Sequence, residues 1–355
     1  MNKTMVVFGT RPEIIKLASV IMALKSIPDF ETIIINTGQQ KQLTEETLKI
    51  FDIDPDYDLE IMIENQSLCH ILEATISKLD NIIQIEKPDL IIVQGDTTTT
   101  LATALCAVYN KVKVLHIEAG VRTDNKMEPY PEEMNRRLIT QIADYNVCQS
   151  LQHLQNLIKE GKFGLVSGNT GIDALKILGE QNTDKCDDIL ITMHRRENWG
   201  EPIRNICEAV KELANDYSGF NFIISCHPNP IVKDDVERIL GGIKNIKIIN
   251  ALPFNKFIQQ MACSKLIITD SGSIPQEAPL FYAPVIITRN ICENQEILDR
   301  NLAVLAGTDK ESIIKHFKNI MGDIDVYTSM LTGDNPYGTG EAYKLIVNYI
   351  TEVLR

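Results

Sequence analysis

The sequence lacks a long apolar run and an excess of positive charge, and each absence excludes a class of protein. No stretch approaches the ~20 apolar residues needed to cross a bilayer, and the N-terminus turns polar after a few apolar residues. We therefore expect no membrane partner and no signal peptide. The net charge of −13 argues against a nucleic-acid partner, because such a protein needs a basic face to displace counterions.

Paired metal-ligand and nucleotide motifs are also missing. The eight cysteines are widely spaced and form no CxxC, and the six histidines do not cluster. We predict reduced, mostly buried thiols in a cytoplasmic protein, and no metal site. No GxGxxG follows the first strand pattern and no GxxxxGK[ST] occurs, so the usual phosphate loops of NAD enzymes and P-loop NTPases are absent.

What is present is a repeated strand–helix pattern. Short apolar runs alternate with helical patterns, namely "TMVVF", "TIIINT", "DLIIVQ", "KVLHIE" and "YNVCQ", then "DILITM", "NFIISC", "NIKIIN", "KLIITD" and "PVIIT". Such runs indicate parallel strands covered on both faces. The pattern predicts an α/β protein of the GT-B fold, with Rossmann-like domains at 1–168 and 169–336. We expect a last helix, in 337–355, to pack back on the first domain.

Polar or glycine-bearing motifs follow six of these strands. They begin at Gly9, Gly95, Glu118, His194, His227 and Asp270. In open parallel sheets the ligand binds outside the carboxyl ends of the strands. With two such sheets, we predict one active-site cleft between the domains.

The segment "LIIVQGDTTTTLA" is the most unusual of these strand ends. We expect Gly95 to end the strand, Asp96 to face the cleft, and the threonines to form the N-cap and first turn of a helix. Asp96 could instead be the N-cap itself. Glu118 could instead be a salt-bridge partner of Arg122, one turn away, and Glu132 could serve only the dipole of a helix that opens after Pro131.

Nine motifs together carry a family resemblance. In order they are "GTRPEIIKLA", "GDTTTTLA", "HIEAGVRT", "YPEEMNRRL", "GNTGIDAL", "HRRENWG", "HPNP", "TDSGSIPQEAP" and "NPYGTGEA". Over essentially its whole length the chain resembles the non-hydrolysing UDP-N-acetylglucosamine 2-epimerases. The resemblance implies a homodimer that interconverts UDP-GlcNAc and UDP-ManNAc for surface polysaccharide synthesis, without metal or NAD cofactor.

The resemblance also implies roles for individual residues. The expected catalytic residues are Asp96, Glu118, Glu132 and His194. The expected nucleotide-binding residues are Arg11, Lys16, Phe257, Ser271, Gly272, Ser273 and Glu277, with Glu277 on the ribose and the Phe257 backbone at the uracil. A second, allosteric UDP-GlcNAc site would involve Gln39, Gln42, Gln66, Arg195 and His227.

The chemistry fits these residues. The C2–H of a GlcNAc unit is not acidified by a carbonyl, but it becomes acidic as UDP leaves C1, and a carboxylate can then remove it. Cations and N–H groups would stabilise the leaving diphosphate, and carboxylates on both faces of C2 would serve as base and acid. A hydrolysing epimerase that releases ManNAc and UDP, and a GT-B glycosyltransferase, remain as alternatives.

Several residues depart from the family pattern. Asn294 stands where relatives often carry arginine, and Pro275 and Leu252 are also unusual. Gln40 stands where relatives carry histidine in the allosteric segment, and Asn65 where some carry arginine. Because each lost cation removes a charge-assisted hydrogen bond, we expect weak activation by UDP-GlcNAc.

Overall fold

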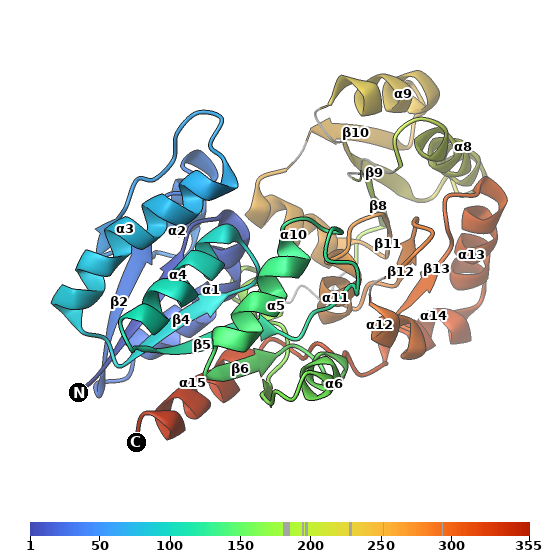
Figure 1. Cartoon of the computed structure of the whole chain (residues 1–355). Coiled ribbons are helices and arrows are strands. Elements are labelled where there is room, and N and C mark those ends of the chain that lie inside the picture. Colours follow the sequence, from blue (N-terminus) through green and yellow to red (C-terminus); the bar gives the residue numbers. More distant parts are fainter. Residues whose placement is uncertain (180–184, 194, 196–197, 227–228, 251, 293) are drawn as a thin grey trace. The chain divides into compact units, whose positions relative to one another are not determined.

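The computed structural model describes residues 1–179, 185–193, 195, 198–226, 229–250, 252–292 and 294–355. The chain divides into two compact units, each built on a parallel sheet (Figure 1). The first unit comprises Met1–Ala174 and Tyr337–Arg355, and the second comprises Leu175–Pro336. Within the described residues, none of the helices is both long and apolar enough to cross a membrane.

The first unit contains a seven-stranded parallel sheet in the order β3-β2-β1-β4-β5-β6-β7, counted over the described residues. Its strands are β1 (Asn2–Phe8), β2 (Phe30–Asn36), β3 (Tyr57–Asp58), β4 (Leu90–Gln94), β5 (Lys113–Ala119), β6 (Tyr145–Cys148) and β7 (Leu165–Val166). Its helices are α1 (Arg11–Lys25), α2 (Gln42–Ile50), α3 (Leu68–Glu86), α4 (Thr98–Tyr109), α5 (Glu132–Ile142), α6 (Leu151–Lys159), most of α7 (Thr170–Leu178) and α15 (Ala342–Val353).

Two helical layers cover this sheet. Helices α3, α4 and α5 pack beside one another, whereas α1 packs with α2 and α15. The central strand β4 is buried at all five positions, as expected for a strand with helices on both faces. The C-terminal helix α15 is held by Asp173 of α7, whose carboxylate accepts the backbone N–H groups of Ala342 (3.0 Å) and Tyr343 (2.7 Å).

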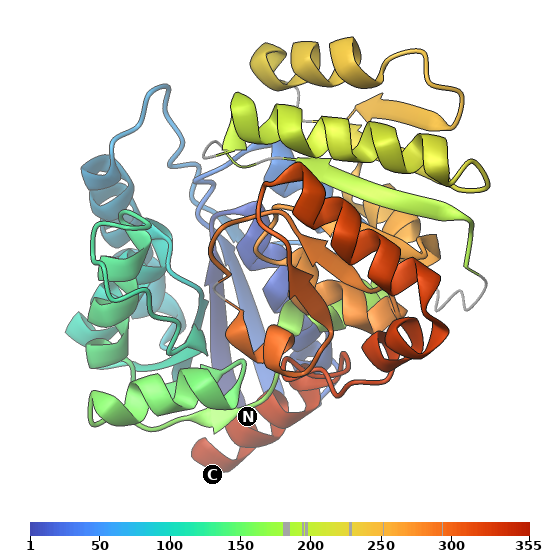
Figure 2. The same ribbon diagram turned by 90° about the vertical axis from the view of Figure 1, so that its right-hand side faces the viewer.

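The second unit contains a six-stranded parallel sheet in the order β10-β9-β8-β11-β12-β13, again over the described residues. Its strands are β8 (Asp188–Met193), β9 (Asn221–Cys226), β10 (Ile246–Asn250), β11 (Leu266–Thr269), β12 (Val285–Ile287) and β13 (Ala303–Leu305). Its helices are α8 (Glu201–Asp216), α9 (Pro230–Leu240), α10 (Phe254–Cys263), α11 (Ile274–Glu277), the 3₁₀ helix η2 (Ala278–Phe281), α12 (Gln295–Asp299), α13 (Lys310–Gly322) and α14 (Ile324–Leu331). Helices α9, α8 and α13 form one layer (Figure 2).

The ten predicted strands are all present, but the prediction missed β3, β7 and β13. These strands have only two or three residues, too few to show an apolar run, and each lies at a sheet edge. Both sheets reverse their strand order beside the first strand of the unit. The reversal lies between β1 and β4 in the first unit, and between β8 and β11 in the second. Ligands of doubly wound sheets bind at such switch points.

Candidate active site

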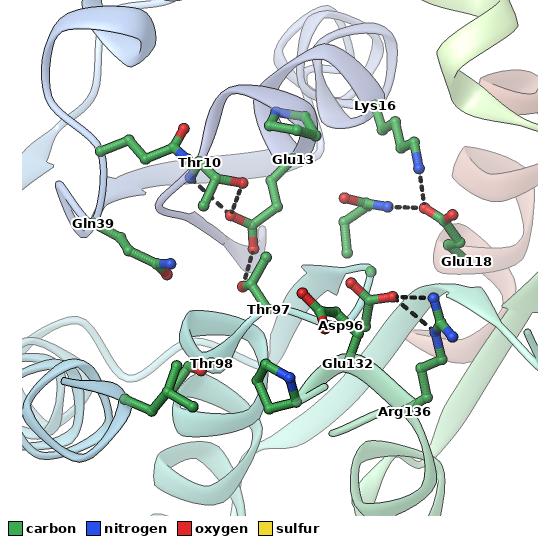
Figure 3. A pocket seen from close by; sticks show the side chains of 16 residues that line it. Thr10, Glu13, Lys16, Gln39, Asp96, Thr97, Thr98, Glu118, Glu132 and Arg136 are labelled. Carbon is green, nitrogen blue, oxygen red and sulfur yellow. Dashed lines mark hydrogen bonds and ion pairs between the residues drawn. The ribbon is translucent and has the colours of Figure 1, made fainter. Parts of the chain in front are cut away.

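Asp96 follows β4 at the switch point of the first unit. Gly95 has a φ of +75°, which glycine adopts without strain, and the chain turns there. The N-cap of α4 is Thr97, whose hydroxyl accepts the Thr100 N–H at 3.1 Å. The alternative that Asp96 caps this helix is therefore wrong. The Asp96 carboxylate instead lines a cavity and pairs with Arg136 at 2.7 Å (Figure 3).

A buried carboxylate, Glu13, accounts for two of the threonines. Its Oε2 accepts the backbone N–H groups of Gly9 (3.0 Å) and Thr10 (2.8 Å) in the loop after β1. Its Oε1 is bonded by the hydroxyls of Thr97 (2.8 Å) and Thr100 (2.9 Å) in the turn after β4. Glu13 thus ties together the two loops that flank the switch point (Figure 3). Burial raises its pKa, although hydrogen bonds from the Gly9 N–H and from the hydroxyls of Thr10, Thr97 and Thr100 oppose that shift.

His116 stabilises the turn before Asp96 by a hydrogen bond to its backbone. This fully buried histidine of β5 lies 2.7 Å through Nε2 from the Gly95 carbonyl. Because a carbonyl only accepts, Nε2 carries the proton. Burial lowers the pKa of His116 to about 4, so the ring is neutral at pH 7.

Glu118 lies near the end of β5 in a strained conformation. Its φ of +72° is unusual for a residue with a side chain, and the register of β5 against β6 shifts between Ile117 and Ala119. Such a bulge redirects one side chain. The Glu118 carboxylate enters the cavity, where it meets Lys16 Nζ at 2.5 Å and the amide of Gln94 (Figure 3). It does not pair with Arg122, which binds Glu160 at 2.7 Å, so that alternative is wrong.

Glu132 and Glu133 open α5 with different environments. Glu133 is fully buried and holds Arg136 and Arg137 at 3.3 and 2.9 Å, so it is structural. Glu132 lines the cavity, and its Oε2 is a buried atom without a hydrogen-bond partner among the described residues. Of the two acids, Glu132 is the one available to a ligand.

The cavity has a volume of about 470 Å³ and combines all three predicted carboxylates. Besides Asp96, Glu118 and Glu132, it is lined by residues from the loops after β1, β2 and β4, from β4 itself and from helices α1, α3, α4 and α5. These are Thr10, Pro12, Glu13, Lys16, Gln39, Gln40, Leu68, Gln94, Gly95, Thr97, Thr98, Pro131 and Arg136. Two basic side chains, Lys16 and Arg136, thus face at least three acids.

Arg11 begins α1 between two lining residues, Thr10 and Pro12. Its backbone N–H donates to Gln40 Oε1 at 3.2 Å. Of the residues predicted to bind the effector, Gln39 lines this same cavity and accepts from Thr99 at 2.7 Å. Gln66 donates to the Gln39 carbonyl at 2.9 Å.

Two further described residues are predicted to bind the effector. Gln42 begins α2. Arg195 belongs to the second unit.

In the second unit, Ser271, Gly272 and Ser273 connect β11 to the four-residue helix α11 that Glu277 ends. The preceding residue, Asp270, is fully buried and accepts the Arg195 N–H and the Asn198 amide, both at 3.0 Å. Ser271 N–H donates to the Thr269 hydroxyl at 3.0 Å.

Phe257 and Asn294 flank this loop in the chain. The Phe257 N–H is already bonded within α10, to the Pro253 carbonyl at 2.9 Å. Asn294, which we expect to depart from the family pattern, is 6% exposed and donates to the Gly272 carbonyl at 2.6 Å. It accepts from Gln276, also at 2.6 Å.

Comparisons with known proteins agree with this architecture. The family model described as UDP-N-acetylglucosamine 2-epimerase matches residues 22–351. The UDP-N-acetylglucosamine 2-epimerase of Bacillus subtilis (strain 168) is 39% identical over 97% of this chain and 94% of its own length. The chain belongs to the UDP-N-acetylglucosamine 2-epimerase family.

Solved structures support both the family and the fold class. The UDP-GlcNAc 2-epimerase from Neisseria meningitidis, bound to UDP-GlcNAc, aligns with a TM-score of 0.86 and 37% identity, covering 99% of this chain and all of that one. A glycosyltransferase from Rickettsia africae shares the fold alone, with a TM-score of 0.64 and 16% identity, covering 100% of this chain and 99% of that one. The predicted GT-B fold is therefore confirmed, and the chain is an enzyme of the epimerase family.

Two predicted site residues, His194 and His227, lie outside the described residues. Among the described residues, three side chains that hold the predicted site residues in place were not singled out by our sequence interpretation. They are Glu13, Gln94 and Arg136. Glu13 had a visible signal, because Thr10-x-x-Glu13 matches a capping box. Gln94 is the polar end of an otherwise apolar strand, and Arg136 lies one turn after Glu132.

Proposed function

We propose that this enzyme interconverts UDP-GlcNAc and UDP-ManNAc by the non-hydrolysing route, for surface polysaccharide synthesis. The observation that supports this most directly is the meeting of Asp96, Glu118 and Glu132 in one cavity. An epimerisation by elimination needs a carboxylate near each face of C2, whereas glycosyl transfer needs only one carboxylate base.

In the proposed mechanism, the C1–O bond to UDP breaks as a carboxylate removes the C2 proton. The products are a glycal with a C1=C2 double bond and UDP. A protonated acid then returns a proton to C2 from the opposite face, and a diphosphate oxygen of UDP adds to C1. All atoms are conserved, so neither water nor a redox cofactor is consumed.

The three acids differ in how they are held, which supports a division of labour. Asp96 pairs with Arg136, and Glu118 with Lys16, so each retains an adjacent cation. Glu132 Oε2 is buried without a partner among the described residues, and such an atom gains a hydrogen bond when a ligand offers a donor. Lys16 is also suited to contact the diphosphate, because its ammonium already lies at the cavity.

We assign recognition of the nucleotide to Arg11, Lys16, His194 and the segment Ser271–Ser273, with Glu277 on the ribose and the Phe257 backbone at the uracil. The cationic side chains of Arg11 and Lys16 would stabilise the negative charge that grows on the leaving diphosphate. The homodimer and a weak UDP-GlcNAc effector site that includes Gln39 and Gln66 are further proposals.

The test is proton and phosphorus NMR of the purified protein with UDP-GlcNAc alone. UDP-ManNAc should accumulate until both sugar nucleotides are at equilibrium, without added NAD or metal. Release of free ManNAc and UDP would instead support the hydrolysing reaction. No epimer until a sugar acceptor is added would support a glycosyltransferase.

A further inference from the structure

Three potential metal ligands converge in the second unit, whereas the cavity of Asp96 lies in the first. Cys186 precedes β8, and Cys263 ends α10. The two Sγ atoms and one carboxylate oxygen of Asp188 all lie within 4.8 Å of one another. The two cysteines are widely spaced in the sequence, so no metal-ligand motif indicated that they would meet.

The sheet register explains why residues so distant in the chain meet. Strands β8 and β11 are parallel, with Ile189 opposite Leu266. The same offset carried back along both chains puts Cys186 opposite Cys263. The Cys186 N–H donates to the Cys263 carbonyl at 2.8 Å, which fixes the two backbones side by side.

We propose that Cys186, Cys263 and Asp188 form a binding site for a thiophilic divalent cation of the Zn²⁺ class, with water as a fourth ligand. Two thiolates and a carboxylate are a donor set that zinc accepts, at about 2.3 Å to sulfur and about 2.0–2.2 Å to oxygen. Ligands around one such ion lie within about 4 Å of one another, so small side-chain rotations suffice. Cys186 is exposed, which gives the ion a path to the site.

The carboxylate is already oriented by amide groups, as metal-ligating carboxylates usually are. Asp188 Oδ1 accepts from Asn221 at 2.9 Å, and Oδ2 accepts from Gln260 at 3.0 Å. The Gln260 amide also lies 3.7 Å from Cys263 Sγ, so it contacts two of the three ligands.

The neighbouring cation does not compete for these ligands. Lys185 Nζ donates to three carbonyl oxygens, those of Ala262 (2.9 Å), Ser264 (2.9 Å) and Phe281 (2.5 Å). Its ammonium is thereby occupied near the C-terminal end of α10. A second positive charge, from a metal, can therefore be received by the thiols and Asp188.

The alternative use of two adjacent thiols is a disulfide, formed when hydrogen peroxide takes two electrons and two protons from the pair and becomes water. The geometry favours the metal, because a disulfide has no use for the Asp188 carboxylate that Asn221 and Gln260 hold in place.

The test is a Co²⁺ titration of the reduced, tag-free, full-length protein without oxygen. One equivalent of Co²⁺ should produce a thiolate-to-cobalt charge-transfer band, and one equivalent of Zn²⁺ should abolish it. Cys186→Ser should greatly weaken the band and the Zn²⁺ affinity. Gln260→Ala should weaken Zn²⁺ binding by about 10–100-fold, the effect typical of an outer-shell partner.

Cys69→Ser is the matched control, since Cys69 is also exposed but lies in the first unit. It should leave the titration unchanged, and thermal melting should show that the Cys186→Ser protein is folded. The proposal is overturned if no charge-transfer band appears, or if the band survives in Cys186→Ser. Peroxide that produces a Cys186–Cys263 disulfide in protein that binds no Co²⁺ would assign the pair to redox chemistry instead.

Discussion

Each unit of the enzyme has an aspartate just after a strand at its switch point, but the two aspartates do different things. Asp96 follows Gly95, whose positive φ turns the chain, so that its carboxylate reaches the cavity and pairs with Arg136. Asp270 follows β11 without a glycine, and its carboxylate is fully buried beneath the loop after β8.

The difference shows that the position of a polar residue after a strand does not by itself define its role. Here the aspartate that follows a glycine of positive φ lines the cavity, whereas the aspartate that follows Thr269 remains buried. In the first unit Thr97 is the N-cap of α4, so the Asp96 carboxylate does not cap the helix and can face the cavity. In the second unit Asp270 accepts a backbone and an amide donor, and it is the following residues, Ser271–Ser273, to which we assign nucleotide binding in our proposal.

The substitution with the largest expected effect on this comparison is Asp96→Asn. If Asp96 acts on C2, turnover should fall by at least ~10²-fold, the range of acid–base groups. Stability should change by less than about 1 kcal/mol, because the pair with Arg136 is part-exposed. Epimer formation by NMR and urea unfolding measure the two effects. Asp124→Asn, at an exposed acid, is the control. Near-normal turnover in Asp96→Asn would remove it from catalysis.

Asp270→Ala should have the opposite effect, with stability reduced more than turnover. It leaves the Arg195 N–H and the Asn198 amide without their acceptor in a buried position, which costs about 1–3 kcal/mol of unfolding free energy. Asp270→Asn retains one acceptor oxygen and should lose less. Urea denaturation measures both variants, and an alanine variant as stable as the parent would contradict the bracing role.

The stability of the turn before Asp96 should depend on pH, because the turn is supported by the titratable side chain of His116. The pKa of His116 is about 4 in the folded protein and about 6.5 when unfolded, so the unfolded chain binds the proton first. Its contribution to stability is therefore complete above pH 6.5 and declines as the pH falls toward 4, by at most about 1.4 kcal/mol per pH unit.

His116→Gln should reduce that dependence of unfolding free energy on pH between 6.5 and 4. The slope is compared rather than the absolute stability, because the substitution disturbs a buried site. His316→Gln, at a part-exposed histidine whose pKa burial also lowers, should reduce the slope less. Equal slopes in His116→Gln and the parent would show that His116 does not remain neutral in the fold.

The smallest effect is expected from Asn294→Ala. Loss of the amide that holds the Gly272 carbonyl should loosen the loop and cost about 1 kcal/mol of UDP binding, or roughly fivefold in affinity. Calorimetry with UDP measures it, and Gln295→Ala, at the exposed neighbour, is the control. Unchanged affinity would show that this loop does not contribute to UDP binding.

Much of this fold could be predicted from the sequence, because long buried strands appear as apolar runs and their ends carry the polar motifs. The convergence of Asp96, Glu118 and Glu132 followed from strand ends together with the family resemblance. The role of Glu13 at the start of α1 could be predicted from the Thr10-x-x-Glu13 capping box. Its bonds to Thr97 and Thr100 could not, and neither could the pairing of Gln94 with Glu118 or of Arg136 with Asp96, because each joins residues on different elements. The pairing of Cys186 with Cys263 depends on the register of β8 and β11, which spacing along the chain does not reveal.

The most direct test of the central claim is the reaction in D₂O. If the acids of the cavity remove and return the C2 proton, deuterium should appear at C2 of UDP-ManNAc as it forms, and at C2 of the recovered UDP-GlcNAc. The signal should be absent from both sugar nucleotides when Asp96→Asn replaces the parent protein. Formation of UDP-ManNAc that retains protium at C2 would contradict proton transfer by these carboxylates.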